Sequence, residues 1–90
     1  MLKFLVEREI PNAGQMGAEA LKQVAQKSCS VQAGMGPRIS WQQSYVADNK
    51  LFCVVLANSE EDIREHGRLG GFPVDRISRV QSVIDPATAG

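Results

Sequence analysis

The sequence has little of what most catalytic or metal centres need. In 90 residues there is one histidine, His66, together with one tryptophan, one tyrosine and two cysteines. A single chain therefore cannot offer the pair of histidines that zinc sites commonly use. Cys29 and Cys53 lie far apart and form no CxxC motif, so we expect two reduced thiols and no structural disulfide.

Neither sign of charge is in excess, because ten Lys and Arg residues balance ten Asp and Glu residues. Without a basic stripe, we expect no binding to nucleic acid. No apolar run reaches the roughly 18 residues of a membrane-spanning helix, so we expect no membrane partner. The apolar stretch before Glu7 and Arg8 is also too short for a secretory signal, so the cytoplasm is the expected location.

Hydrophobic periodicity predicts four strands and two helices. The strands are expected over 2–10, 39–47, 51–57 and 77–84, and the helices over 18–32 or beyond and from 59 to 70. The first strand alternates regularly except at Arg8, which interrupts its apolar face. The unbroken apolar run of 51–57 predicts a central strand covered on both faces. Gly34, Gly36 and the pair Gly70–Gly71 are expected to end the helices.

The order βαββαβ in a chain of this length indicates an α+β, ferredoxin-like fold. Residues 1–90 form one domain in this interpretation, with a frayed tail over 85–90. We expect both helices on one face of a four-stranded antiparallel sheet, with the first and third strands central and parallel to each other. The other face would be bare, so we expect a homodimer packed sheet to sheet, a dimeric α+β barrel.

His66 lies in residues 63–73, the segment where charged side chains and the only imidazole are most concentrated. A projection at 100° per residue places it with Ile63, Gly67 and Gly70 on the side of the helix that faces the sheet. Gly67 is costly in a helix, so it either permits close approach of the backbone or leaves room for a ligand. His66 itself is either a buried histidine bonded to a carbonyl or a functional group.

The placement of two further candidates, Tyr45 and Cys53, depends on strand register. A turn over Asp48-Asn49-Lys50 would pair Tyr45 with Cys53 and bring both near His66, whereas a two-residue turn at Asp48-Asn49 would pair Tyr45 with Phe52. Glu7 and Glu9 share one side of the first strand and could bind a cation or form salt bridges. They would face away from His66 if Phe4 and Val6 face the helices.

Several stretches resemble a family of small bacterial proteins that was long described as of unknown function. One member of that family has been described as a nickel-binding protein. The matching stretches, in chain order, are Phe4-Leu5-Val6-Glu7-Arg8, Trp41-Gln42-Gln43-Ser44-Tyr45-Val46, Ile63-Arg64-Glu65-His66, Gly71-Phe72-Pro73 and Val83-Ile84-Asp85-Pro86.

The resemblance implies a ferredoxin-like fold, a homodimer and the binding of nickel or another divalent transition metal. By matching position, it implies that Glu7, Tyr45, Cys53 and His66 are ligands or lining residues of the metal site. One position departs from the family, which favours histidine where this chain has Gln43. Glutamine is a poor ligand for nickel.

Three hypotheses of function follow, the last being a structural or interaction module without a site, which predicts a closed pocket and His66 bonded to the backbone. The first is a small dimeric metal-binding protein in which His66, Cys53 and Glu7 or Tyr45 supply the donors. The second is a small-molecule-binding protein or cofactor-free enzyme of the dimeric ferredoxin-like barrel type, with His66 as acid, base or hydrogen-bond donor. Its pocket would be lined by the aromatic residues Trp41, Tyr45, Phe52 and Phe72. An apolar pocket with His66 on its wall would favour the second hypothesis.

Overall fold

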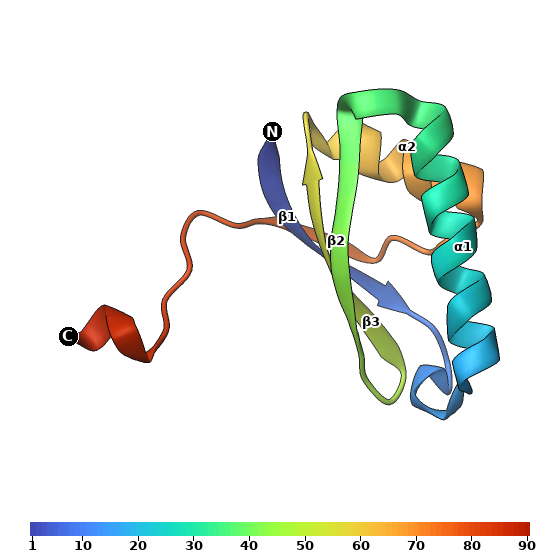
Figure 1. Cartoon of the computed structure of the whole chain (residues 1–90), viewed down its shortest axis with the longest axis horizontal. Coiled ribbons are helices and arrows are strands. Elements are labelled where there is room, and N and C mark those ends of the chain that lie inside the picture. Colours follow the sequence, from blue (N-terminus) through green and yellow to red (C-terminus); the bar gives the residue numbers. More distant parts are fainter.

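Two helices cover one face of a four-stranded sheet, as Figure 1 shows for the computed structural model, which describes residues 1–90. The elements are β1 (Leu2–Glu9), α1 (Ala18–Met35), β2 (Ile39–Val46), β3 (Lys50–Ala57), α2 (Glu60–Gly70) and β4 (Arg76–Arg79), with short 3-10 turns at 13–15, 36–38 and 86–89. The predicted βαββαβ order and α+β, ferredoxin-like fold are confirmed. None of the helices is both long enough and apolar enough to span a membrane.

The strand order is β2-β3-β1-β4, and every neighbouring pair is antiparallel. The first and third strands are central as predicted, but the prediction that they run parallel is wrong. The first crossover makes β2 parallel to β1, and the β2–β3 hairpin then reverses the chain. As a result, β3 must run against β1.

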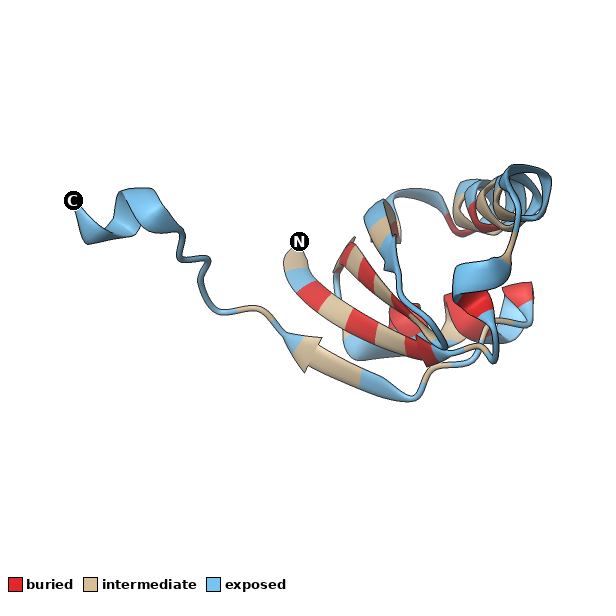
Figure 2. Ribbon diagram, turned by 90° about the horizontal axis from the view of Figure 1, so that it is seen from below, coloured by how far each residue is buried: buried red, intermediate tan, exposed pale blue.

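The core lies between the sheet and the helices. On β3 the burial alternates strictly, so that Leu51, Cys53, Val55 and Ala57 are buried and the residues between them are only half-buried. Figure 2 shows the same alternation as stripes along the central strands. The expectation that β3 is covered on both faces is therefore wrong within the chain: its second face, here called the outer face, carries no helix.

The alternation of buried and less buried residues along β1 continues through Arg8. Its charge interrupts the apolar pattern of the sequence, yet the residue is buried on the apolar face, with 4% of its surface exposed. Glu7 and Glu9 consequently point to the outer face. Glu7 is paired there with Lys50 at 3.3 Å and Arg76 at 3.9 Å.

A β-bulge at Gln42 changes the phase of β2. The pairs are Trp41 with Val55 before the bulge and Ser44 with Cys53 after it. The bulge inserts one extra residue, so side chains that follow it swap faces. Tyr45 therefore pairs with Phe52 on the outer face, and the predicted single face for Ile39, Trp41, Gln43, Tyr45 and Ala47 is wrong. Of the two registers considered, the one with a two-residue turn at Asp48-Asn49 is present.

The chain after β4 leaves the body of the molecule. Beyond Arg79 it extends outward and ends in the 3-10 turn Pro86–Ala89, as Figure 1 shows. Val83 and Ile84 on this arm are 70% and 80% exposed. The predicted fourth strand is thus shorter than its apolar pattern suggested, because the hydrogen bond from the Val80 N–H to the Lys3 carbonyl is the last one that joins the chain to β1.

Candidate functional site

His66 faces the sheet from α2, as its helical projection predicted. Only 4% of its surface is exposed, and Ile63, Gly67 and Gly70 are buried with it. Its Nε2 forms a hydrogen bond with the Ser28 hydroxyl of α1 at 3.2 Å. Its Nδ1 is enclosed and has no hydrogen-bond partner. The partner of the histidine is therefore a hydroxyl and not the carbonyl that a purely structural histidine was expected to have.

The surroundings keep the His66 ring neutral. Burial lowers the pKa of His66 from its ordinary value of 6.5, and the positive charge of Arg8 lowers it further. The Ser28 backbone opposes this lowering of the pKa but does not reverse it. At neutral pH the ring thus has one donor nitrogen and one acceptor nitrogen.

Phe72 holds His66 and Arg8 at the same end of the site. Its ring stacks on the imidazole with 5.5 Å between centroids, and the Arg8 guanidinium carbon lies 5.7 Å from the Phe72 centroid. Arg8 Nη1 donates a hydrogen bond to the Pro73 carbonyl at 2.8 Å. The loop after α2 therefore fixes the positions of the Arg8 guanidinium and the His66 imidazole.

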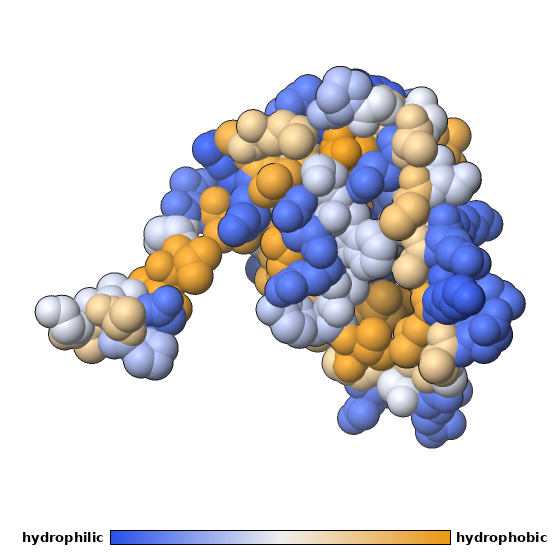
Figure 3. Space-filling view, viewed as in Figure 1, coloured by the Kyte–Doolittle hydropathy of each residue, from blue (hydrophilic) through white to orange (hydrophobic).

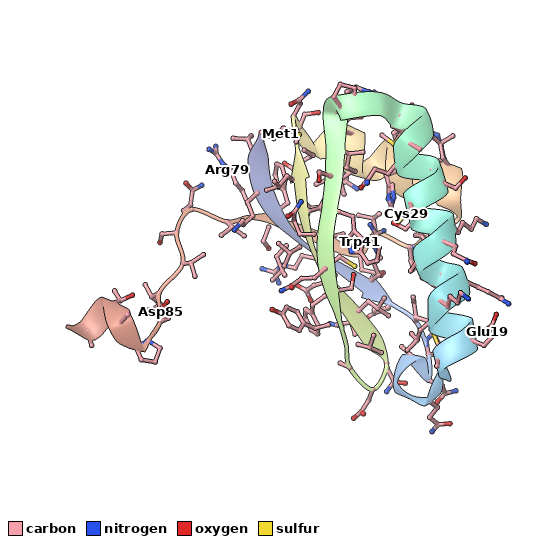
Figure 4. The ribbon with its side chains drawn as sticks, viewed as in Figure 1. Met1, Glu19, Cys29, Trp41, Arg79 and Asp85 are labelled. Carbon is pink, nitrogen blue, oxygen red and sulfur yellow. The ribbon has the colours of Figure 1, made fainter.

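A chain of hydrogen bonds lines the opposite wall. Trp41 Nε1 donates to the Ser44 hydroxyl at 2.9 Å, and that hydroxyl donates to Cys53 Sγ at 2.9 Å. The bulge at Gln42 makes this possible, since it turns Ser44 to the same face as Trp41 and Cys53. In Figure 4 the Trp41 side chain lies on the side of β2 that faces α1. Cys29 is exposed on α1, whereas Cys53 is buried, and both thiols are free.

These walls enclose a cavity of about 200 Å³ between α1, α2 and the sheet. Most of its lining is apolar: 11 of the 15 lining residues are hydrophobic. Its mouth is visible in Figure 3 as apolar surface between the lower half of α1 and the β2–β3 hairpin. The lining residues are Arg8, Ile10, Leu21, Val24, Ala25, Ser28, Ile39, Trp41, Ser44, Val46, Leu51, Cys53, Val55, His66 and Phe72.

Sequence reasoning missed three polar residues of this cavity: Arg8, Ser28 and Ser44. Strict alternation on β1 would have indicated that Arg8 faces inward. Ser28 lies on the same side of α1 as Leu21, Val24 and Ala25, where a hydroxyl needs a partner when it is buried. Ser44 carried no signal, because its face depends on the bulge.

The predicted site residues fall into two groups. His66 and Cys53 both line the cavity, with Trp41 and Phe72 as expected. Glu7 and Tyr45 lie on the outer face, and Phe52 lies there between them. The expectation that Tyr45 and Phe52 line the pocket is therefore wrong. The structure contains no group of three or more His, Cys, Asp and Glu side chains that could hold a metal ion.

The chain matches a known protein family over most of its length. Residues 4–80 match the family described as "Nickel responsive protein SCO4226-like". The chain belongs to this family. A crystal structure of SCO4226 from Streptomyces coelicolor A3(2) superposes with a TM-score of 0.77 at 17% identity, covering 91% of this chain and 99% of that one. At this identity the likeness shows the fold. No match was found among the curated proteins.

The family description raises the question of whether the residues of one chain could bind a nickel ion. Nickel takes imidazole, thiolate and carboxylate donors. Here the only imidazole and the buried thiol lie on one side of the sheet, and Glu7 lies on the other. His66 already shares Nε2 with Ser28, and the Arg8 charge beside it opposes a second cation. The donors of a single chain do not fit a nickel ion.

Proposed function

We propose that the protein binds a small, largely apolar molecule in the cavity beneath α1. The observation that carries this proposal is the cavity itself, about 200 Å³ in volume, apolar over most of its wall and provided with a few fixed polar groups. Ligand sites in proteins have this composition. An apolar cavity of about 150 Å³ is already large enough for benzene.

The packing of α1 supports the same proposal. The side of the helix that faces the sheet presents Leu21, Val24 and Ala25 to the cavity, and of its 18 residues only Ser28 and Met35 are buried. An apolar helix face that does not complete a packed core leaves its surface available to a ligand. The polar groups of the wall, His66 above all, would then orient that ligand.

Trp41 makes this proposal easy to test, because it is the only tryptophan and it lines the cavity. We expect neutral probes such as benzyl alcohol and cyclohexanol to change its fluorescence saturably and to shift NMR signals of cavity residues. Ala25→Leu would fill part of the cavity. We expect it to weaken probe binding about tenfold, a loss of roughly 1.4 kcal/mol in binding free energy.

The matched control is Gln26→Leu, which adds the same side chain at an exposed neighbouring position. It should leave probe binding unchanged. Equal binding by Ala25→Leu and the wild type, or no saturable binding of any probe at millimolar concentration, would refute the proposal.

We further propose that the chain forms a homodimer through its outer face. Half-buried apolar side chains are gathered there on the two central strands, namely Leu5, Phe52, Val54 and Leu56. A sheet face of this composition is stabilised by a second layer. A second copy placed on this face would give the dimeric α+β barrel.

Nickel binding is the second candidate function, and family membership favours it. Since the donors of one chain do not fit, the site would have to lie between two copies. Glu7 and Tyr45 are the donors suited to this arrangement, because both lie on the outer face. Each pairs with Phe52, from opposite sides. Lys50 and Arg76 would have to release Glu7 first.

Calorimetric titration with Ni²⁺ tests the second candidate. A site between copies predicts weaker binding for Glu7→Gln and unchanged binding for His66→Ala. The opposite result would place nickel in the cavity with His66 and Cys53. Unchanged affinity in both variants would exclude Glu7 and His66 as nickel ligands.

A further inference from the structure

Arg8 is a buried cation without an acidic partner. It is 4% exposed, and its Nη1 donates to the Pro73 carbonyl. The ion pairs of the molecule involve Arg38, Lys50 and Arg76 but not Arg8. A buried charge is normally paired, because desolvation is costly. A guanidinium has five N–H donors, so the bond to Pro73 leaves hydrogen-bonding capacity unused.

His66 supplies a second unsatisfied group at the same end of the cavity. Both residues pack on Phe72, and both line the cavity. The Nδ1 atom of the neutral ring has no partner in the protein, and it donates or accepts according to the tautomer that the Ser28 contact selects. The wall thus holds a positive charge with no acidic partner, beside an imidazole nitrogen with no hydrogen-bond partner.

Most of the remaining cavity wall is apolar. Leu21, Val24 and Ala25 face it from α1, and Val46 and Leu51 face it from the hairpin. A ligand that matches both ends therefore has one anionic group and an apolar body. The volume of about 200 Å³ limits that body to a single ring or a short chain.

Resting on the cavity's proposed function, we infer that its ligand is a small monocarboxylate, bound with its carboxylate on Arg8 and its apolar body against α1. The planar guanidinium fork matches the two oxygens of a carboxylate. A single arginine balances a single negative charge, which favours a carboxylate over a doubly charged phosphate. Binding would also bring a negative charge close to His66 and offset the effect of Arg8 upon it.

Matched acid and amide pairs test this inference in the wild-type protein. The probes are hexanoate with hexanamide and phenylacetate with phenylacetamide, which differ in charge but hardly in shape. NMR titration at pH 7.5 should show each acid binding at least about tenfold more tightly than its amide, as expected for a charged hydrogen bond. The pKa of His66 should rise in the acid complex. The ionisable groups lining the cavity are Arg8, Cys53 and His66, so the imidazole signal reports this directly.

Arg8→Met removes the charge while it keeps most of the side-chain volume. The preference for the acid should be lost in this variant, and binding of the amide should remain. Arg68→Met, at an exposed position of α2, is the control and should keep the preference. If Arg8→Met does not fold, the acid and amide comparison in the wild type still decides.

The outcomes separate the inference from the proposed function. Equal or tighter binding of the amides overturns the carboxylate inference and leaves a cavity for neutral apolar molecules. Absence of binding by acids and amides alike overturns the proposed function and the inference with it.

Discussion

Buried polar side chains give the interior of this protein its chemical character. Arg8, Ser28 and His66 are three of its four buried polar or charged residues, and all three line the cavity. Apolar residues of similar volume would pack the same space without unpaired groups. The retention of a charge and an imidazole here is the reason to assign the cavity a ligand.

His66 makes stability depend on pH. Burial and Arg8 hold its pKa below 6.5 in the folded protein, and the unfolded chain restores the ordinary value. As the pH falls below about 6.5, the unfolded state binds a proton that the folded state resists, so the free energy of unfolding decreases. This contribution is complete once the pH is below the folded pKa.

We therefore predict that His66→Gln flattens the pH dependence between pH 7 and 5. Urea denaturation of wild type and variant at half-unit intervals measures it. Carboxylates titrate in both proteins and cancel in the comparison. Parallel curves for the two proteins across this interval would contradict the assigned direction of the shift.

At the scale of elements, hydrophobic periodicity predicted the features that depend on one segment of the chain alone. The inward side of α2 is as projected, because 3.6-residue repetition needs no knowledge of neighbours. The bulge at Gln42 could not be predicted in this way. No glycine or proline marks it, and it exists only as a pairing between β2 and β3. One unpaired residue thus moved Tyr45 away from His66 and brought Ser44 to Cys53.

Gly67 shows how α2 approaches the rest of the chain. A Cβ atom at this position would lie 2.7 Å from Val74 Cγ2 and 3.0 Å from the Phe72 carbonyl oxygen. We predict that Gly67→Ala lowers the free energy of unfolding by ~1–3 kcal/mol, because overpacking outweighs the gain in helix propensity. Thermal and urea unfolding measure this change.

Gly34→Ala is the matched control for that prediction. Gly34 lies within α1, and nothing would lie within 4 Å of its added Cβ. Here the substitution should stabilise the protein by ~0.5–1 kcal/mol, since only the helix propensity changes. Stabilisation by both substitutions would show that α2 has room to move.

At the scale of the whole molecule, one layer of the fold has no cover. The radius of gyration is 13.7 Å, against about 12 Å for a compact domain of this length. The arm after β4 accounts for the excess, since it leaves the body with Val83 and Ile84 exposed. The sequence predicted the bare face from topology and a frayed tail over 85–90, but the apolar pattern of 77–84 predicted a strand where residues 80–84 belong to the arm.

We predict that Val54→Lys converts a dimer into a monomer. Val54 lies on the outer face between Leu5 and Gln43, and a buried lysine between two such faces would have no partner. Sedimentation velocity across a range of concentrations should give a dimer for the wild type and a monomer for the variant. Gln26→Lys, which adds the same charge at an exposed position of α1, should remain dimeric.

Truncation after Val80 separates the contribution of the arm from that of the face, because a face-to-face dimer persists without residues 81–90. A wild-type protein that sediments as a monomer at all concentrations would refute the homodimer, and a nickel site shared by two copies would be excluded with it.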